Sequence, residues 1–286
     1  MPQLPASLIP AVERFRRDRL FQVGAVLVVA VVLVALFAPF LAAFDPLTGD
    51  LQGYLLRPGT AGHLLGTDAQ GRDVWSRVIY GARISLMVGL ISQTVALATG
   101  VTLGLVAGYY GKSVDSVIMR LADVTLAFPT LLLLIAVAAA IRPSLPITFV
   151  LIGIVGWAGM ARLVRGQVLV LRSAEYVQAA QALGAPARRI LWRHLLPNVQ
   201  AQVIVAATLG IAGAMMAEAA LSFLGLGAQP PTPSWGAMVS DGRDLLRVAP
   251  WVSFAPGLAI GLAVLGFNLV GDGLREAYDP RLKSDQ

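Results

Sequence analysis

Several carboxylates and one lysine of this chain are residue types that can carry out catalysis, and their spacing decides which chemistry is open to them. Asp123 and Asp272 would have to face each other at matched depth to act as the aspartate pair of an intramembrane protease. Both fall near the ends of apolar runs, and the residues around them form no recognisable active-site motif. The tripeptide Gly-Lys-Ser at 111–113 is similar to the end of a phosphate-binding loop, but Val106 stands where that motif needs its first glycine, and no predicted strand precedes it. We therefore expect no catalytic residue and no nucleotide site in this chain.

Metal-ligating residue types are scarce. Because the chain has no cysteine, disulfides and thiolate metal sites are excluded. The sequence contains no cluster of His, Cys or Met, so we expect no metal site, and His63 is interpreted as structural. Glu218 is the one carboxylate predicted to lie inside an apolar run, where a costly ionisable group indicates a gate or a pathway. Its place near the outer end of that run also permits snorkelling or capping, and both interpretations stay open.

Composition indicates the kind of element that must position these residues. Hydrophobic residues make up 57% of the chain and charged residues only 13%, about half the charged fraction of a soluble domain. This balance predicts a membrane protein surrounded by lipid. The net charge of +6 is better explained by arginines that set topology than by nucleic-acid binding, so no nucleic-acid partner is expected.

Charge-free runs locate the membrane spans, since a bilayer core needs about 20 apolar residues per helix. The runs are Leu20–Phe44, Ile84–Gly111, Val124–Ile141, Pro143–Ala161, His194–Ala217 and Val248–Gly271. The sequence therefore predicts an all-α membrane protein with six transmembrane helices. The first run is too long for a secretory signal peptide and is interpreted as a retained anchor.

The distribution of Lys and Arg predicts the orientation. With the N-terminus inside, 15 of the 22 Lys and Arg residues fall on the inner side and 7 on the outer side. The predicted organisation is a cytoplasmic segment over 1–19, a first transmembrane helix over 20–44, an extracytoplasmic segment over 45–83, a five-helix core over 84–272 that includes a cytoplasmic loop over 165–197, and a cytoplasmic tail over 273–286. Both termini are expected in the cytoplasm.

The extracytoplasmic segment is expected to contain a short helix that begins near Thr67 or Asp68 and lies along the outer membrane surface. Its apolar face would carry Val74, Trp75, Val78 and Ile79. Whether this helix covers helix ends or contacts a substrate stays open.

Glycine and proline positions predict packing and bending within the spans. Pro129 lies one turn inside the third span, where it either kinks a mobile gating helix or simply starts the helix. Residues 142–143 (Arg-Pro) predict a tight outer turn before the fourth span. Small residues four apart let two membrane helices pack closely, and this spacing joins Gly100, Gly104 and Gly108 in the second span and Gly257 and Gly261 in the last.

The longest polar interruption in the second half of the chain runs from Ser173 to Pro197. Ser173 is expected to cap a helix that has Glu175 in its first turn. Gly184 should end that helix, and Pro186 fits the start of a second one. The first helix carries a small apolar face made of Tyr176, Ala179, Ala180 and Leu183. This face either folds back on its own protein or docks a partner, and both hypotheses are open at this point.

A family resemblance rests on four phrases between residues 63 and 236: HLLGTDAQGRDVWSRVIYGARISL, DVTLAFPTLLL, EYVQAAQALGAPARRILWRHLLPN and LSFLGLGAQPPTPSWG. A fifth, FNLVGDGLREAYDPRL, extends it nearly to the end of the chain. With these phrases the chain resembles the permease subunits of the dipeptide/oligopeptide/nickel class of bacterial ABC importers. The polar segment is similar to that family's "EAA" loop, except that Gln178 replaces the usual Glu and His194 replaces an Ile. These departures put any role for the first carboxylate in doubt.

The resemblance implies a type I importer fold in the bacterial inner membrane, in which this chain and a homologous permease form the translocation path. Two cytoplasmic ATPases would bind ATP and Mg, an extracytoplasmic binding protein would deliver the substrate, and this chain would hold no cofactor. The polar segment would couple the ATPases to the pore through Glu175, Tyr176, Gln178, Ala179, Ala180, Leu183, Gly184, Ala185, Arg188, Arg193 and Pro197.

The favoured substrates are di- and oligopeptides, because the sequence contains no metal-ligating cluster. The alternatives are nickel chelates or another small solute of the same importer class, and an energy-independent channel or scaffold. A secondary transporter is not expected, since apart from Glu218 the predicted spans hold no charge that could couple an ion gradient.

Overall fold

The structure is a computed structural model that describes residues 18–141 and 144–278. Helices dominate this part of the chain, and its β pairing is confined to isolated bridges, one of which joins Thr60 to His63. Three parts of the predicted organisation lie outside the described residues: residues 1–17 of the cytoplasmic segment, the outer turn at 142–143, and residues 279–286 of the cytoplasmic tail.

Five helices in the described ranges are long and apolar enough to cross a membrane. They are α2 (Arg19–Leu36), α4 (Val74–Tyr110), α7 (Leu145–Arg172), α10 (Leu196–Phe223) and α12 (Trp251–Tyr278). A sixth crossing results if the bent pair α5 (Lys112–Ala127) and α6 (Thr130–Ala140) acts as one span. The all-α prediction is therefore confirmed, and this count agrees with the six predicted spans.

The third predicted span, Val124–Ile141, is not one continuous helix. α5 and α6 meet at an angle of 88°, and Pro129 occupies the N-cap position of α6. Proline restricts the residue before it to extended conformations, and Phe128 has the extended values φ −91° and ψ 138°. Pro129 therefore separates two helices at a sharp bend, instead of kinking a single one.

The prediction of a short, separate helix on the outer membrane surface is wrong. The helix begins at Val74, where the Asp73 side chain caps it by accepting from the Ser76 N–H at 2.7 Å, and it continues without a break to Tyr110. Val74 and Ile79 are buried, because α11 (Trp235–Gly242) and the start of α12 pack over this first part of α4. Gly81 falls near the expected end of the predicted surface helix but does not interrupt α4, and a Cβ there would lie 2.6 Å from the Trp235 side chain.

The most extensive helix–helix packing among the described residues joins α4 to α7. A Cβ atom placed on Gly100 would lie 2.6 Å from Met160 Cβ, and one on Gly108 would lie 2.7 Å from Val168 Cβ. Gly104 faces α7 in the same way, so these glycines pack within the chain. The same spacing in α12 has a different outcome: a Cβ on Gly261 would meet nothing within 4 Å among the described residues, and one on Gly257 only a distant side-chain atom.

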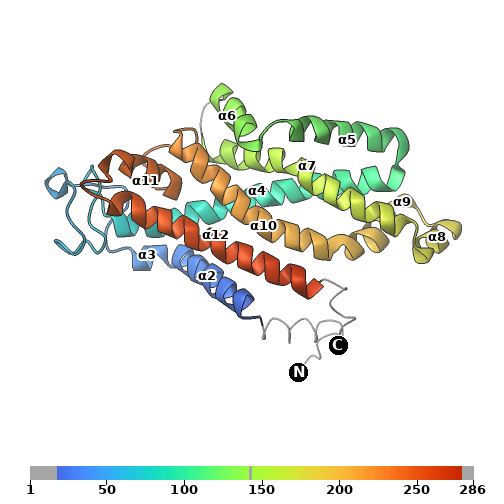
Figure 1. Cartoon of the computed structure of the whole chain (residues 1–286), viewed down its shortest axis with the longest axis horizontal. Helices are drawn as coiled ribbons and strands as arrows, with labels where there is room; N and C mark the ends of the chain where they lie inside the picture. The colour runs from blue at the N-terminus through green and yellow to red at the C-terminus, as the bar shows by residue number, and fades with distance from the viewer. Residues whose placement is uncertain (1–17, 142–143, 279–286) are drawn as a thin grey trace.

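Figure 1 shows the two ends of the molecule separated along its long axis. α8 (Glu175–Ala182) and α9 (Ala187–Arg189) lie at one end, which we call the α8 end. α3 (Ala38–Leu41), α11 and the loop over 42–73 lie at the other, which we call the α11 end. α2 packs along α12, where a Cβ on Gly24 would lie 2.6 Å from Leu269 Cβ.

Candidate functional site

The polar segment over 173–197 forms α8, α9 and the π-helix η2 (Ile190–Leu195) at the α8 end. The prediction that Ser173 caps α8 is wrong. Ser173 ends α7, and its Oγ donates to the Val170 carbonyl at 2.8 Å, because serine hydroxyls readily bond back to a carbonyl of the preceding turn. Ala174 occupies the N-cap position of α8 instead, while Glu175 does lie in the first turn.

Gln178 has a structural role at this junction. Its Nε2 donates to the Ser173 carbonyl at 3.2 Å, so the side chain of α8 holds the end of α7. A carboxylate at this position has no N–H to donate. The glutamine that departs from the family pattern therefore provides a contact that the usual glutamate does not.

Gly184 ends α8, as predicted. Its φ of 75° lies in the left-handed region, which glycine adopts without strain. Its N–H donates to the Gln181 carbonyl at 2.9 Å, and the next N–H, from Ala185, donates to Ala180 at 3.0 Å. These two bonds form a Schellman motif, which satisfies the last carbonyls of the helix and sets the direction in which the chain leaves it.

The small apolar face of α8 stays uncovered. Leu183 is 88% exposed and Tyr176 is 43% exposed, and Ala179 is also exposed. Val177 points the other way and is fully buried. Within the described residues, α8 is thus anchored to the protein through Val177 and presents most of its apolar face outward, while Ala180 is half-buried and the Tyr176 ring lies 6.5 Å from the ring of His194.

The anchor of α8 belongs to a core cluster that reaches three long helices. The cluster consists of Leu105 from α4, Met160, Val164 and Val168 from α7, Val177 from α8, Ile190, Leu191 and Leu195 from η2, and Val199 from α10. The remaining residues predicted for coupling lie at the same end: Ala185 is half-buried, and Arg188, Arg193 and Pro197 are exposed. Because close-packed side chains transmit displacement, a movement of α8 would reach α4, α7 and α10 directly.

A cavity of about 390 Å³ lies between α4, α6, α7 and α10, and we call it the inter-helix cavity. Most of its lining residues are small or apolar, including Gly156, Gly159, Gly210 and Gly213. Its polar lining residues are Ser92, Gln93 and Thr130. Thr130 and Ala217 are the chain neighbours of Pro129 and Glu218, but Pro129 and Glu218, the residues singled out for a gate or pathway, do not line this cavity themselves.

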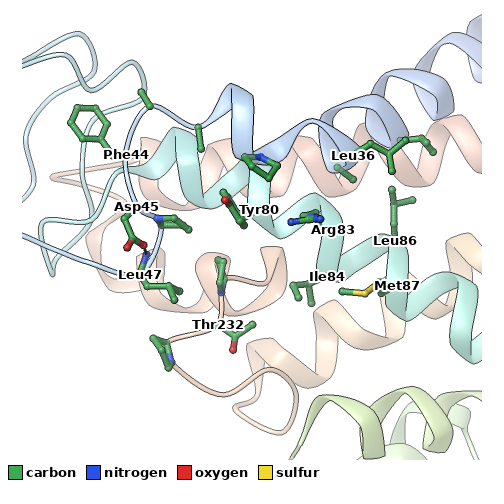
Figure 2. A pocket seen from close by; sticks show the side chains of 18 of the residues that line it. Leu36, Phe44, Asp45, Leu47, Tyr80, Arg83, Ile84, Leu86, Met87 and Thr232 are labelled. Carbon is green, nitrogen blue, oxygen red and sulfur yellow. Dashed lines mark hydrogen bonds between the residues drawn. The ribbon is translucent and has the colours of Figure 1, made fainter.

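A larger cavity of about 1010 Å³ lies toward the α11 end, between α2, α3, the first turns of α4 and the loop that carries Thr232 (Figure 2). Its walls are mostly apolar, with Leu36, Leu86 and Met87 at one end. Arg83 also lines the wall, with its guanidinium carbon 5.9 Å from the centre of the Tyr80 ring. No sequence spacing indicated this cavity, because segments far apart in the sequence build it.

Glu218 is enclosed within the protein. It is only 1% exposed, its Oε1 accepts from the Ser222 hydroxyl at 2.6 Å, and its Oε2 has no hydrogen-bond partner among the described residues. Ser222 Oγ in turn accepts from the Ala228 N–H at 3.0 Å and lies 3.3 Å from Ser234 Oγ. The snorkelling interpretation is therefore wrong, since the loop after α10 and the start of α11 fold over the carboxylate. Ser222, which donates to Glu218, ties α10 to that loop by accepting from Ala228.

Charged side chains gather at the α11 end. Arg72 Nε lies 2.7 Å from Asp68 Oδ2, Arg77 Nε lies 3.5 Å from the same oxygen, and Arg72 Nη2 lies 3.7 Å from Asp241 Oδ2. Burial raises the pKa of Asp241 above its ordinary value, although Arg77 and Arg72 oppose this shift. His63 Nδ1 lies 2.9 Å from Asp73 Oδ1, which agrees with its structural interpretation. Among the described residues no three His, Asp or Glu side chains come together as a metal site.

Comparison with known proteins adds a family to this geometry. Residues 100–284 match the family described as binding-protein-dependent transport system inner membrane component. Residues 10–58 match the N-terminal TM domain of oligopeptide transport permease C.

Individual relatives match along nearly the whole chain. The dipeptide transport system permease protein DppC of Alkalihalophilus pseudofirmus is 46% identical over 96% of this chain and 90% of its own length. The oligopeptide transport system permease protein OppC of Bacillus subtilis is 41% identical over 96% and 89%. The glutathione transport system permease protein GsiD of Pectobacterium atrosepticum is 42% identical over 95% and 90%. Identity of this extent, together with the helical architecture, shows that the chain belongs to the inner membrane component family of binding-protein-dependent transport systems, the non-catalytic permease subunits of ABC importers with the type I permease fold.

Proposed function

We propose that this chain is the permease subunit of an ATP-driven importer of di- and oligopeptides, and that it forms the translocation path together with a homologous permease. The names of the dipeptide and oligopeptide permeases that resemble it support the substrate class. The observation that carries the mechanism is the uncovered apolar face of α8, held on a buried cluster that α4, α7 and α10 share.

In this proposal the α8 end and both termini face the cytoplasm. A groove on a partner ATPase receives Tyr176, Ala179 and Leu183, and Ala180 allows close seating because its side chain is small. The partner ATPases bind ATP and Mg and hydrolyse the ATP, while this chain breaks no bond. An extracytoplasmic binding protein delivers the substrate at the α11 end.

The path of the movement follows from the packing. Displacement of α8 pushes Val177 against Ile190 and Leu195, which belong to the segment that leads into α10. The same cluster contacts α7 and α4, and α4, α7 and α10 also line the inter-helix cavity. Closure of the ATPases would therefore reshape the cavity and turn it from inward-facing to outward-facing. Pro129 and Glu218 lie next in the chain to the lining residues Thr130 and Ala217, and we assign them to the pathway.

The test uses the complete importer, with its partner permease, ATPases and binding protein, in proteoliposomes. Ala180→Arg places a long charged side chain on the docking face, and Gly184→Pro imposes a negative φ where the chain has 75°. Each variant should abolish peptide uptake and substrate-stimulated ATP hydrolysis while membrane insertion stays intact. Ser113→Arg, which adds the same charge at an exposed position near the start of α5, is the control and should transport normally. Normal substrate-stimulated ATPase activity in Ala180→Arg would disprove the docking assignment.

A further inference from the structure

The inter-helix cavity contains an amide side chain with no partner. Gln93 lies near the middle of α4, is only 8% exposed and lines the cavity. Its side chain makes no hydrogen bond to any residue in the described part of the chain. The other polar side chains of the wall differ: Ser92 Oγ donates to the Phe149 carbonyl at 2.8 Å, and Thr130 is exposed.

This amide adds no hydrogen bond within the described residues, so folding alone does not require it. Its polar atoms are accessible at the cavity wall, where they can bond to water or to a bound ligand, whereas an apolar residue of similar size would offer neither bond. The opposing helix leaves room for the amide, because a Cβ on Gly210 of α10 would overlap Gln93 Oε1. Glycine at 210 and glutamine at 93 thus form a matched pair that keeps an amide at the cavity wall.

We propose that Gln93 is a substrate-contacting residue that hydrogen-bonds the peptide group of the transported peptide. This inference rests on the proposed function. A side-chain amide offers one carbonyl acceptor and an NH₂ donor. The N–H and C=O of a trans peptide group point in opposite directions, so Gln93 bonds to one of them, and we assign the bond to Gln93 Oε1, which accepts from the peptide N–H. Every peptide has this group whatever its side chains are. The cavity is large enough for a small ligand, since such sites have volumes of about 300–1,000 Å³.

The test combines a change in the protein with a change in the substrate. Gln93→Met keeps the approximate size and length of the side chain but removes both hydrogen-bonding groups. The substrates are dialanine and its analogue with a methylated peptide nitrogen, which lacks the N–H. Uptake of both is measured with the complete importer in proteoliposomes. The binding protein is identical throughout, so its own preference cancels when the ratio of the two uptake rates is compared between variant and wild type.

In wild type, dialanine should be taken up faster than its analogue once the preference of the binding protein is allowed for. Gln93→Met should slow dialanine uptake about three- to tenfold, the effect of losing about one hydrogen bond, and should reduce the ratio by a similar factor. Gly210→Ala, which displaces the amide without removing it, should change the ratio in the same direction. Thr94→Val is the control, because Thr94 is exposed and its hydroxyl bonds to Leu90 of its own helix, and the ratio should not change.

The failures are distinguishable. An unchanged ratio in Gln93→Met, in a complex whose wild type imports dialanine, overturns the role of Gln93 and leaves the proposed function intact. Loss of the partner permease on purification of Gln93→Met also overturns it, because the amide then belongs to the contact between permeases. A wild-type complex that imports neither peptide refutes the proposed function and the inference together.

Discussion

Shortening Leu183 to alanine should weaken the binding of the permease to its ATPases. Leu183 is 88% exposed in this chain alone, so the change removes little packing from the fold and should alter its free energy of unfolding by less than about 0.5 kcal/mol. In a docking groove the same side chain becomes buried. Burial of a leucine side chain contributes about 2 kcal/mol, so Leu183→Ala should raise the Kd for the ATPase about 30-fold.

The measurement is the binding of purified partner ATPase to the permease pair in nanodiscs, without nucleotide. Leu246→Ala is the matched control, because Leu246 is also largely exposed, at 54%, but follows α11 at the opposite end. Its Kd for the ATPase should equal that of wild type. A Kd for Leu183→Ala within about threefold of the wild-type value would refute the reasoning, because a fully buried leucine cannot be removed at so small a cost.

Three further predictions concern packing and charge. Gly104→Ala should lower the free energy of unfolding in detergent by about 1–3 kcal/mol, because a Cβ there would lie 2.6 Å from a backbone oxygen of α7. Gly159→Ala should be neutral in the same assay, because a Cβ there would meet nothing within 4 Å among the described residues. Glu218→Leu should cost about 1–3 kcal/mol because the Ser222 hydroxyl loses its acceptor, and Glu218→Gln, which keeps an acceptor, should cost less; equal losses would contradict this. Burial raises the pKa of Asp241, so the Asp241 carboxyl binds its proton more tightly in the folded state than in the unfolded state. This difference adds to the free energy of unfolding at low pH, and the contribution is lost as the pH rises through the raised folded pKa. Asp241→Asn should remove that part of the decline when unfolding midpoints are measured between about pH 4 and pH 7; an unchanged decline would exclude this carboxylate as its source.

Much of the architecture follows from the sequence, because a membrane span must be apolar over its whole length and must satisfy its backbone internally. Charge-free runs therefore locate the crossings, but they do not show where one helix stops and another begins. At Pro129 the proline separates two helices at 88°, while at Val74 a helix begins and passes straight from the expected surface segment into the core. Both outcomes depend on neighbouring elements that a local pattern does not contain.

In the candidate site, too, local features could be predicted from the sequence, whereas features that depend on neighbouring elements could not. Gly184 could be predicted to end α8, because the left-handed conformation at a helix end is a local requirement that glycine meets. A glycine at every fourth position does not show which helix packs against it. Gly104 packs on α7, whereas a Cβ on Gly261, which has the same spacing, would meet nothing within 4 Å among the described residues. Gln93 gave no signal, because one amide in an apolar run becomes notable only beside Gly210 on another helix.

The length of α4 has a mechanical consequence. Its 37 residues form one helix about 55 Å long, well beyond the roughly 30 Å of a bilayer core. One end is packed under α11 through Val74, and the other joins the α8 cluster through Leu105. A rod without a hinge that tilts about a point near its middle moves its two ends in opposite directions. In the proposed function, an inward push at the α8 end would swing the α11 end outward, so that opening on one face of the membrane and closing on the other would be one motion of one helix.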